Sequence, residues 1–247
     1  MNNGNPRIKP EFWRDIIVNN CKICGGTGVQ MLNENASSIA LCKCSRMVRL
    51  FVKMNDPEHG LHPKYHKWTL SNATDLSVST KKKIKEYLKT VETKNPFRNL
   101  IIKGGKNSGK SSVASIVYKF LMTREYEVSM VRFSEIVALS RFFIANSKEF
   151  SDRKDLYDLL RDEQFLIIED VDNRGHSDST NFEKLGYGLL DEVFSYRANH
   201  PRRATIITVD SDLNITPSTL GRSFYYSIYT SDVEDNKICE LELDKKR

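Results

Sequence analysis

The sequence contains no apolar run that approaches the length of a membrane-spanning helix, and its first ten residues are polar, without the apolar core of a signal peptide. It also lacks internal repeats and low-complexity tracts. Charged residues make up 28% and apolar residues 39% of the 247 residues, as in ordinary globular domains. We therefore expect a soluble cytoplasmic protein without a membrane partner.

Cysteine is scarce after residue 44, because four of the five cysteines lie in the first 44 residues. A C-x-x-C pair precedes the glycine-rich run 25–28, and a C-x-C pair follows a predicted hairpin; the four residues are Cys21, Cys24, Cys42 and Cys44. In a cytoplasmic chain this grouping indicates a metal rather than disulfides. Four thiolates about 2.3 Å from one Zn²⁺ would form a tetrahedral structural site, which a segment this small needs for its fold. The alternatives are four reduced cysteines, or a substitute ligand among His59, His62 and His66.

The net charge of +6 favours a polyanionic partner such as DNA, although solvated lysine faces explain it equally well. One basic segment is an amphipathic helix expected around Arg46–Lys53, which would bind DNA, bind a protein partner or cover the cysteine cluster. Another is Lys81–Lys85, at the start of a predicted helix, which is either a solvated face or a contact for single-stranded DNA.

The most specific motif begins where the apolar run Asn99–Lys103 stops at a glycine. The next eight residues fit G-x-x-x-x-G-K-[ST], and apolar residues then recur at helical spacing. A strand, a glycine-rich loop and a helix N-terminus in this order surround phosphate oxygens with backbone N–H groups. Lys110 is expected to reach the β- and γ-phosphates and Ser111 to ligate Mg²⁺. The predicted nucleotide-binding residues are Gly104, Gly105, Lys106, Asn107, Ser108, Gly109, Lys110, Ser111 and Ser112.

Two acidic residues follow another apolar strand, because Glu169 and Asp170 come directly after the run 165–168. Burying charge without a partner is costly, so we interpret the pair as functional. In a phosphate-loop enzyme Glu169 would face the Mg²⁺ ion and Asp170 would polarise the attacking water. Two solvated acids at a strand end are the alternative.

Further strands are expected at 127–133, 202–210 and 237–243, with helices between the strands. This alternation predicts an α/β fold with a parallel central sheet and right-handed crossovers. The expected division is a zinc-binding module at 1–57, a linker at 58–78 and a three-layer P-loop ATPase domain at 79–247.

With these pieces in order, the chain resembles the DnaC/IstB-type AAA+ ATPases, which include bacterial and phage helicase loaders. The resemblance covers roughly residues 58–230 and, more loosely, the cysteine segment; the phosphate loop, the acid pair and the run 205–208 carry it. It implies ATP as the nucleotide, Asp210 or Thr208 at the sensor position, and Arg222 as an arginine finger offered to a neighbouring subunit. It also implies a replicative hexameric DNA helicase as partner, single-stranded DNA as a ligand, and self-association in a ring or spiral or on the helicase.

Two departures from the family pattern predict slow hydrolysis. The family usually has Asp before Glu where this chain has Glu169 before Asp170, and an amide where this chain has Asp210. We therefore expect an ATP-switched helicase loader whose zinc module grips the helicase. The alternatives are an IstB-like ATP-dependent regulator of transposition that binds duplex DNA, and an adaptor that keeps nucleotide binding only for structure.

Overall fold

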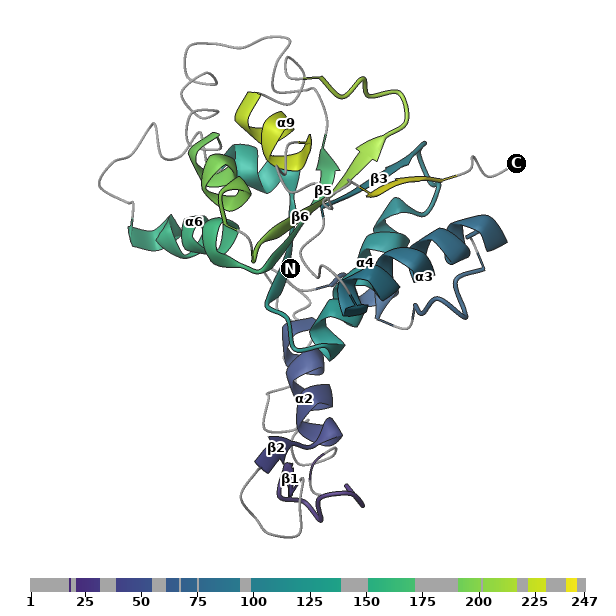
Figure 1. Ribbon diagram of the computed structural model, residues 1–247, viewed down its shortest axis with the longest axis vertical. Helices are drawn as coiled ribbons and strands as arrows, with labels where there is room; N and C mark the ends of the chain where they lie inside the picture. Colours follow the sequence, from purple (N-terminus) through teal and green to yellow (C-terminus); the bar gives the residue numbers. More distant parts are fainter. Residues whose placement is uncertain are drawn as a thin grey trace, which may run out of the picture.

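The computed structural model describes residues 18, 21–31, 39–54, 61–66, 68–74, 76–93, 99–138, 151–171, 191–200, 202–216, 222–229 and 239–243. In this part of the chain a five-stranded sheet lies between helices, and a two-stranded hairpin lies at the far end of a projecting helix (Figure 1). Among these residues no helix combines the length and apolarity needed to cross a bilayer. The spacing of Phe12, Trp13, Ile16 and Ile17 suits a short amphipathic helix, which falls outside the described residues.

The central sheet is parallel throughout, with the strand order β4-β5-β6-β3-β7. Its strands are β3 (Leu100–Gly104), β4 (Val128–Arg132), β5 (Phe165–Val171), β6 (Ala204–Asp210) and β7 (Cys239–Glu242). The parallel sheet expected from the sequence is thus confirmed, and β7 occupies an edge. Because the strands run in one direction, the phosphate loop after β3 shares its edge of the sheet with the last residues of β5 and β6.

Helices cover both faces of the sheet, which gives the three layers predicted from the sequence (Figure 1). One face carries α3 (Val78–Thr93) and α4 (Lys110–Thr123), and the other carries α6 (Ser151–Asp162), a helix over 191–198 and α9 (Arg222–Tyr229). Successive residues of one strand enter opposite cores: Phe165 and Ile167 pack on the α4 side, Leu166 and Ile168 on the other. A strand buried on both faces explains the continuous apolar runs in the sequence.

The projecting helix is α2 (Lys43–Met54), which follows a hairpin of two antiparallel strands, β1 (Val29–Met31) and β2 (Ile39–Leu41) (Figure 1). Its C-terminal half packs against the sheet domain, since Leu50 and Met54 are buried in the core that also contains residues of α4. Closer to its start, Arg46 Nε lies 2.9 Å from Glu125 Oε1, just beyond α4.

The segment expected to be a linker also contributes to this core. Leu61, Ala73 and Leu76 are buried in it, and the short 3₁₀ helix η1 (Pro63–Tyr65) lies between the first two. We call residues 61–66, 68–74 and 76 the connecting segment. Packing therefore joins α2, the connecting segment and α4, while the domain boundaries at residues 57 and 78 stay a prediction.

Candidate nucleotide-binding site and metal centre

The loop between β3 and α4 adopts a backbone that requires glycine at its last position. Gly109 has a φ of 97°, in the left-handed region, and a β-carbon placed there would lie 3.1 Å from Leu76 Cδ2. Asn107 is also left-handed, with a φ of 63°. Turns of this kind form concave runs of N–H groups that bind anions, and the first N–H groups of α4 lie beside them.

The amine of Lys110 lies over this loop. Its Nζ donates to the carbonyl oxygens of Gly104, at 2.5 Å, and Gly105, at 3.0 Å. The same atom lies 3.8 Å from Oδ2 of Asp210, the last residue of β6. These contacts keep a positive charge at the edge of the sheet where the loop would bind phosphate.

Glu169 meets the start of α4 from the neighbouring part of the sheet. Its carboxylate accepts a hydrogen bond from the Ser111 hydroxyl. Burial raises the pKa of Glu169 above its ordinary value, and this hydrogen bond only partly opposes the rise. Its Oε1 is buried and has no hydrogen-bond partner within the described residues. An unsatisfied carboxylate oxygen beside a serine hydroxyl fits the oxygen ligands that Mg²⁺ prefers.

The second acid lies in an irregular part of β5. Asp170 has a left-handed φ of 56°, and the pairing of β5 with β6 shifts register between Ile168 and Val171. The Asp170 N–H donates to Oγ1 of Thr208, which is buried in β6, at 2.9 Å. The acids were expected to end the strand, but β5 continues through them to Val171. As a result Glu169 faces α4 while the Asp170 side chain is exposed.

The two residues considered for the sensor position lie in different surroundings. Asp210 is close to Lys110, whereas Thr208 fixes the backbone of Asp170. Arg222 is exposed at the first residue of α9, and the structure gives it no contact with the loop among the described residues. Its role as an arginine finger stays a prediction.

The remaining residues of the loop motif divide by burial. Lys106 and Asn107 are exposed, and Ser108 and Ser112 are buried. The hydroxyl oxygen of Ser108 has no hydrogen-bond partner within the described residues. The nucleotide-binding roles of all nine motif residues remain proposals.

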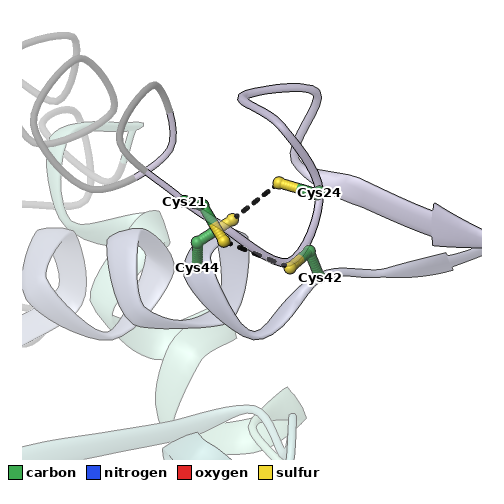
Figure 2. Close-up of side chains that lie close together, drawn as sticks. All are labelled: Cys21, Cys24, Cys42 and Cys44. Carbon is green, nitrogen blue, oxygen red and sulfur yellow. Dashed lines mark hydrogen bonds between the residues drawn. The ribbon is translucent and has the colours of Figure 1, made fainter.

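Four cysteines converge at the base of the hairpin (Figure 2). Cys21 and Cys24 lie in the loop before β1, Cys42 follows β2, and Cys44 is in the first turn of α2. The sulfur of Cys21 is 3.7 Å from that of Cys42, and the sulfur of Cys24 is 3.5 Å from that of Cys44. All four sulfur atoms lie within 4.8 Å of one another.

These distances fit a metal ion, because a tetrahedron with 2.3 Å zinc–sulfur bonds has sulfur–sulfur edges of about 3.8 Å. Burial opposes ionisation of Cys24, but N–H donors, including Gly28 at 3.3 Å from its sulfur, bring its pKa down to about 6. Burial raises the pKa of Cys44 to about 12. A bound Zn²⁺ would hold all four as thiolates. Of the histidines named as substitutes, His66 instead bonds to backbone carbonyl groups.

One residue of this region, Lys119, was not singled out from the sequence, and another, His66, was named only as a substitute metal ligand. Lys119 in α4 donates to the carbonyl oxygens of Tyr65, His66 and Trp68 in the connecting segment. The signal for Lys119 was a single lysine in the otherwise apolar stretch 116–122 of a largely buried helix. No comparable signal indicates that His66 bonds to backbone carbonyl groups, because its acceptors come from two separate stretches of backbone.

The fold is that of AAA+ domains of replication proteins of known structure. The DnaC helicase loader aligns over 74% of this chain and 100% of its own, with a TM-score of 0.55 and 18% identity. DnaI aligns over 75% and 93%, with a TM-score of 0.52 and 13% identity. Domain III of the Thermotoga maritima replication initiation protein DnaA aligns over 73% and 68%, with a TM-score of 0.50 and 15% identity. No model of a protein family and no curated protein sequence matches the chain. The AAA+ P-loop fold expected from the sequence is confirmed.

Proposed function

We propose that this chain is an ATP-dependent loader or remodeller of a replicative DNA helicase and that slow ATP hydrolysis acts as its switch. One observation carries the proposal: Lys110, Ser111 and Glu169 meet at one edge of the sheet, on a fold that covers the whole of the DnaC helicase loader structure. The phosphate loop supplies nucleotide binding, and the likeness to DnaC and DnaI supports the choice of partner.

ATP would bind with its phosphates against residues 104–112. The backbone N–H groups and the start of α4 would hold phosphate oxygens, and Lys110 would exchange its carbonyl contacts for the β- and γ-phosphates. Ser111 and Glu169 would hold Mg²⁺, which neutralises charge on the transferring phosphoryl group. The long arm of Glu169 already reaches Ser111, so the unusual order of the acids leaves the metal position intact.

Hydrolysis is expected to be slow because of the acidic side chains that would lie near the attacking water and the γ-phosphate. Asp170 would orient this water as a base, with an arm one methylene shorter than the usual Glu. Asp210 adds a carboxylate next to Lys110, so its charge opposes the γ-phosphate and competes for the amine. A slow site suits a switch, in which the bound nucleotide sets the state of an assembly.

The remaining parts of the proposal concern assembly. The zinc module would grip the helicase, and Arg222, exposed on α9, would reach the nucleotide of a neighbouring subunit in a ring or spiral or on the helicase. Single-stranded DNA would be a further ligand. The protein would act in the cytoplasm.

Nucleotide binding is tested by titrating a fluorescent ATP analogue into the full chain with Mg²⁺. Lys110→Ala should weaken binding by tenfold or more, because it removes the charge over the loop. Lys82→Ala is the matched control, since Lys82 is an exposed lysine of α3, outside the loop. Equal affinities of both variants and the wild type would refute the assignment of the site.

The partner is tested by size-exclusion chromatography with light scattering, using the host's hexameric helicase with and without ATP. A complex that forms with ATP and is lost in the Cys21→Ser, Cys24→Ser variant supports the proposal. Cys239→Ser controls for the loss of a thiol, because Cys239 lies in β7, outside the cluster. A complex unaffected by the double change would remove the role given to the zinc module.

A second candidate is a nucleotide-binding adaptor without significant turnover, which the carboxylate of Asp210 beside Lys110 favours. If Lys110→Ala left helicase binding and every ATP-dependent effect intact, this candidate would replace the first. Chromatography with duplex or single-stranded DNA in place of the helicase tests the transposition regulator, which a preference for the duplex would favour.

A further inference from the structure

The connecting segment is tied to α2 by one imidazole. His66 Nε2 lies 2.9 Å from the carbonyl oxygen of Leu61 and 3.2 Å from that of Met54, the last residue of α2. Both partners are acceptors, so the Nε2 atom carries the proton and shares it between them. The free carbonyl group at the end of α2 is thereby satisfied by a residue twelve positions further along the chain.

The same segment is tied to the helix of the phosphate loop by a lysine. Lys119 Nζ donates to the carbonyl oxygens of Tyr65, at 3.0 Å, His66, at 3.4 Å, and Trp68. Tyr65 is the last residue of η1, and its carbonyl oxygen also accepts from the Trp68 N–H at 3.1 Å, while His66 and Trp68 follow the end of this short helix. Burial lowers the pKa of Lys119, so its ammonium group depends on these carbonyl groups for solvation.

The far end of the segment rests on the loop itself. Leu76 is buried, and its Cδ2 lies 3.1 Å from the position that a β-carbon of Gly109 would take. An ion pair also joins α2 to the turn after α4, because Arg46 of α2 pairs with Glu125. We call the four cysteines and their hairpin (21–31 and 39–44) the cysteine module. One continuous set of contacts therefore joins the phosphate loop, the connecting segment, α2 and this module.

We propose that Lys119 and His66 are positioning residues that couple the nucleotide site to the cysteine module, Lys119 by fixing the connecting segment on α4 and His66 by fixing the end of α2 on that segment. This coupling rests on the proposed function, because it requires nucleotide binding at the loop. It adds a route by which the bound nucleotide affects the cysteine module. A ligand that restricts the motion of the loop also restricts Leu76 and α4. The side chains of Lys119 and His66 transmit this restriction to α2. Coupling is reciprocal, so a partner bound to the module would change nucleotide affinity by the same factor.

The experiment is hydrogen–deuterium exchange on the full chain, with and without Mg²⁺ and a non-hydrolysable ATP analogue. In the wild type, nucleotide should slow exchange in the loop, in residues 61–76 and in the last turn of α2, the last by about fivefold or more. Lys119→Met keeps the aliphatic stem and removes the donor, so the response should remain in the loop and disappear from 61–68 and α2. His66→Leu should keep the response in the connecting segment and lose it only in α2.

Controls separate coupling from a loss of folding. Lys82→Met changes an exposed lysine of α3 and should respond like the wild type. Lys119→Arg keeps donors for the carbonyl groups and should restore the α2 response. Without nucleotide, Lys119→Met should already speed exchange at 65–68 and at the end of α2, whether or not the loop binds ATP.

A wild-type response confined to the loop would overturn the coupling while leaving the proposed function standing. An α2 response that survives Lys119→Met would also overturn it. If the analogue bound nowhere, the proposed function would fail, and a change at α2 in the nucleotide-free Lys119→Met protein would still support the positioning role.

Discussion

Removal of Zn²⁺ is expected to unfold the hairpin and the start of α2 while the sheet domain stays folded. The hairpin region buries little else within the described residues: its cluster contains Val18, Cys42 and Cys44, with Val48 partly buried against it. Burying one valine stabilises by about 2 kcal/mol. Ordering the backbone of residues 21–31 costs on the order of 10–20 kcal/mol, at about 1–2 kcal/mol per residue. A structural Zn²⁺ contributes about 10–16 kcal/mol, which is the size of the difference between this entropy cost and the contribution of the valine.

The rest of α2 should not follow. Leu50 and Met54 belong to the core under α4, and removing the metal leaves that core unchanged. The assay combines metal analysis of the purified protein with hydrogen exchange and thermal unfolding, before and after a zinc chelator. Amides of 21–31 and 39–45 should lose protection, and the main unfolding transition should move by only a few degrees.

A substitution gives the same test without a chelator. Cys42→Ser should release the metal and unfold the hairpin, and Cys239→Ser should change neither. Protein purified without metal whose hairpin amides are nevertheless protected would refute the reasoning, because the small core would then suffice. A large fall of the main transition would also contradict it, by showing that the module and the sheet domain share their stability.

Three further changes test the site and the sheet beneath it. Gly109→Ala should strain the loop by about 1–3 kcal/mol and weaken nucleotide binding about tenfold or more in a titration, because φ at this position is 97°; unchanged affinity would contradict the loop geometry. Glu169→Gln removes a buried charge, so the thermal midpoint should stay the same or rise by about 2–4 °C, while Mg²⁺-dependent hydrolysis falls. The wild type gains stability as the pH drops toward the raised pKa of Glu169, and the variant should lose this pH dependence. A lower midpoint would contradict the idea that the ionised carboxylate destabilises the fold. Arg197→Met should lower the midpoint by about 10 °C because it leaves buried carbonyl groups unpaired, without changing nucleotide affinity; exposed Arg202→Met is the control, and equal midpoints would show that Arg197 is not needed.

The phosphate loop and the strands of the sheet were predictable because both depend on local pattern. Strands buried on both faces must be apolar throughout, and the stretches 100–102 and 165–168 are. The loop motif fixes its own neighbours, a strand before and a helix after it. The four cysteines were predictable for a similar reason, since metal-ligand spacing is a property of the sequence.

The course of β5 through its two acids was not predictable, because it depends on a neighbouring strand. Four apolar residues followed by two acids indicate a strand that ends in the acid pair. In the structure the N–H of Asp170 bonds to Thr208 of β6, and this contact carries the strand past the irregularity to Val171. Nothing in the residues 165–171 alone specifies Thr208 as the partner. The contacts of Lys119 are also nonlocal, since its acceptors lie 51–54 positions earlier in the chain, and one acceptor of His66 lies 12 positions earlier.

Buried polar atoms without a partner in the described residues occur at both edges of the sheet, and those at the carboxyl ends lie at the proposed nucleotide site. At the amino ends of the strands, buried Arg197 donates to Thr205 Oγ1 and to four backbone carbonyl groups, which satisfies its side chain. At the carboxyl ends, Glu169 keeps a buried oxygen without a partner in the described residues, and Ser108 keeps a buried hydroxyl in the same condition. Glu163, at the amino ends, also keeps a buried carboxylate oxygen without a partner in the described residues, so such an atom alone does not locate a ligand. The two atoms at the carboxyl ends, by contrast, lie beside Lys110 and Ser111, and a ligand with phosphate and metal would complete them.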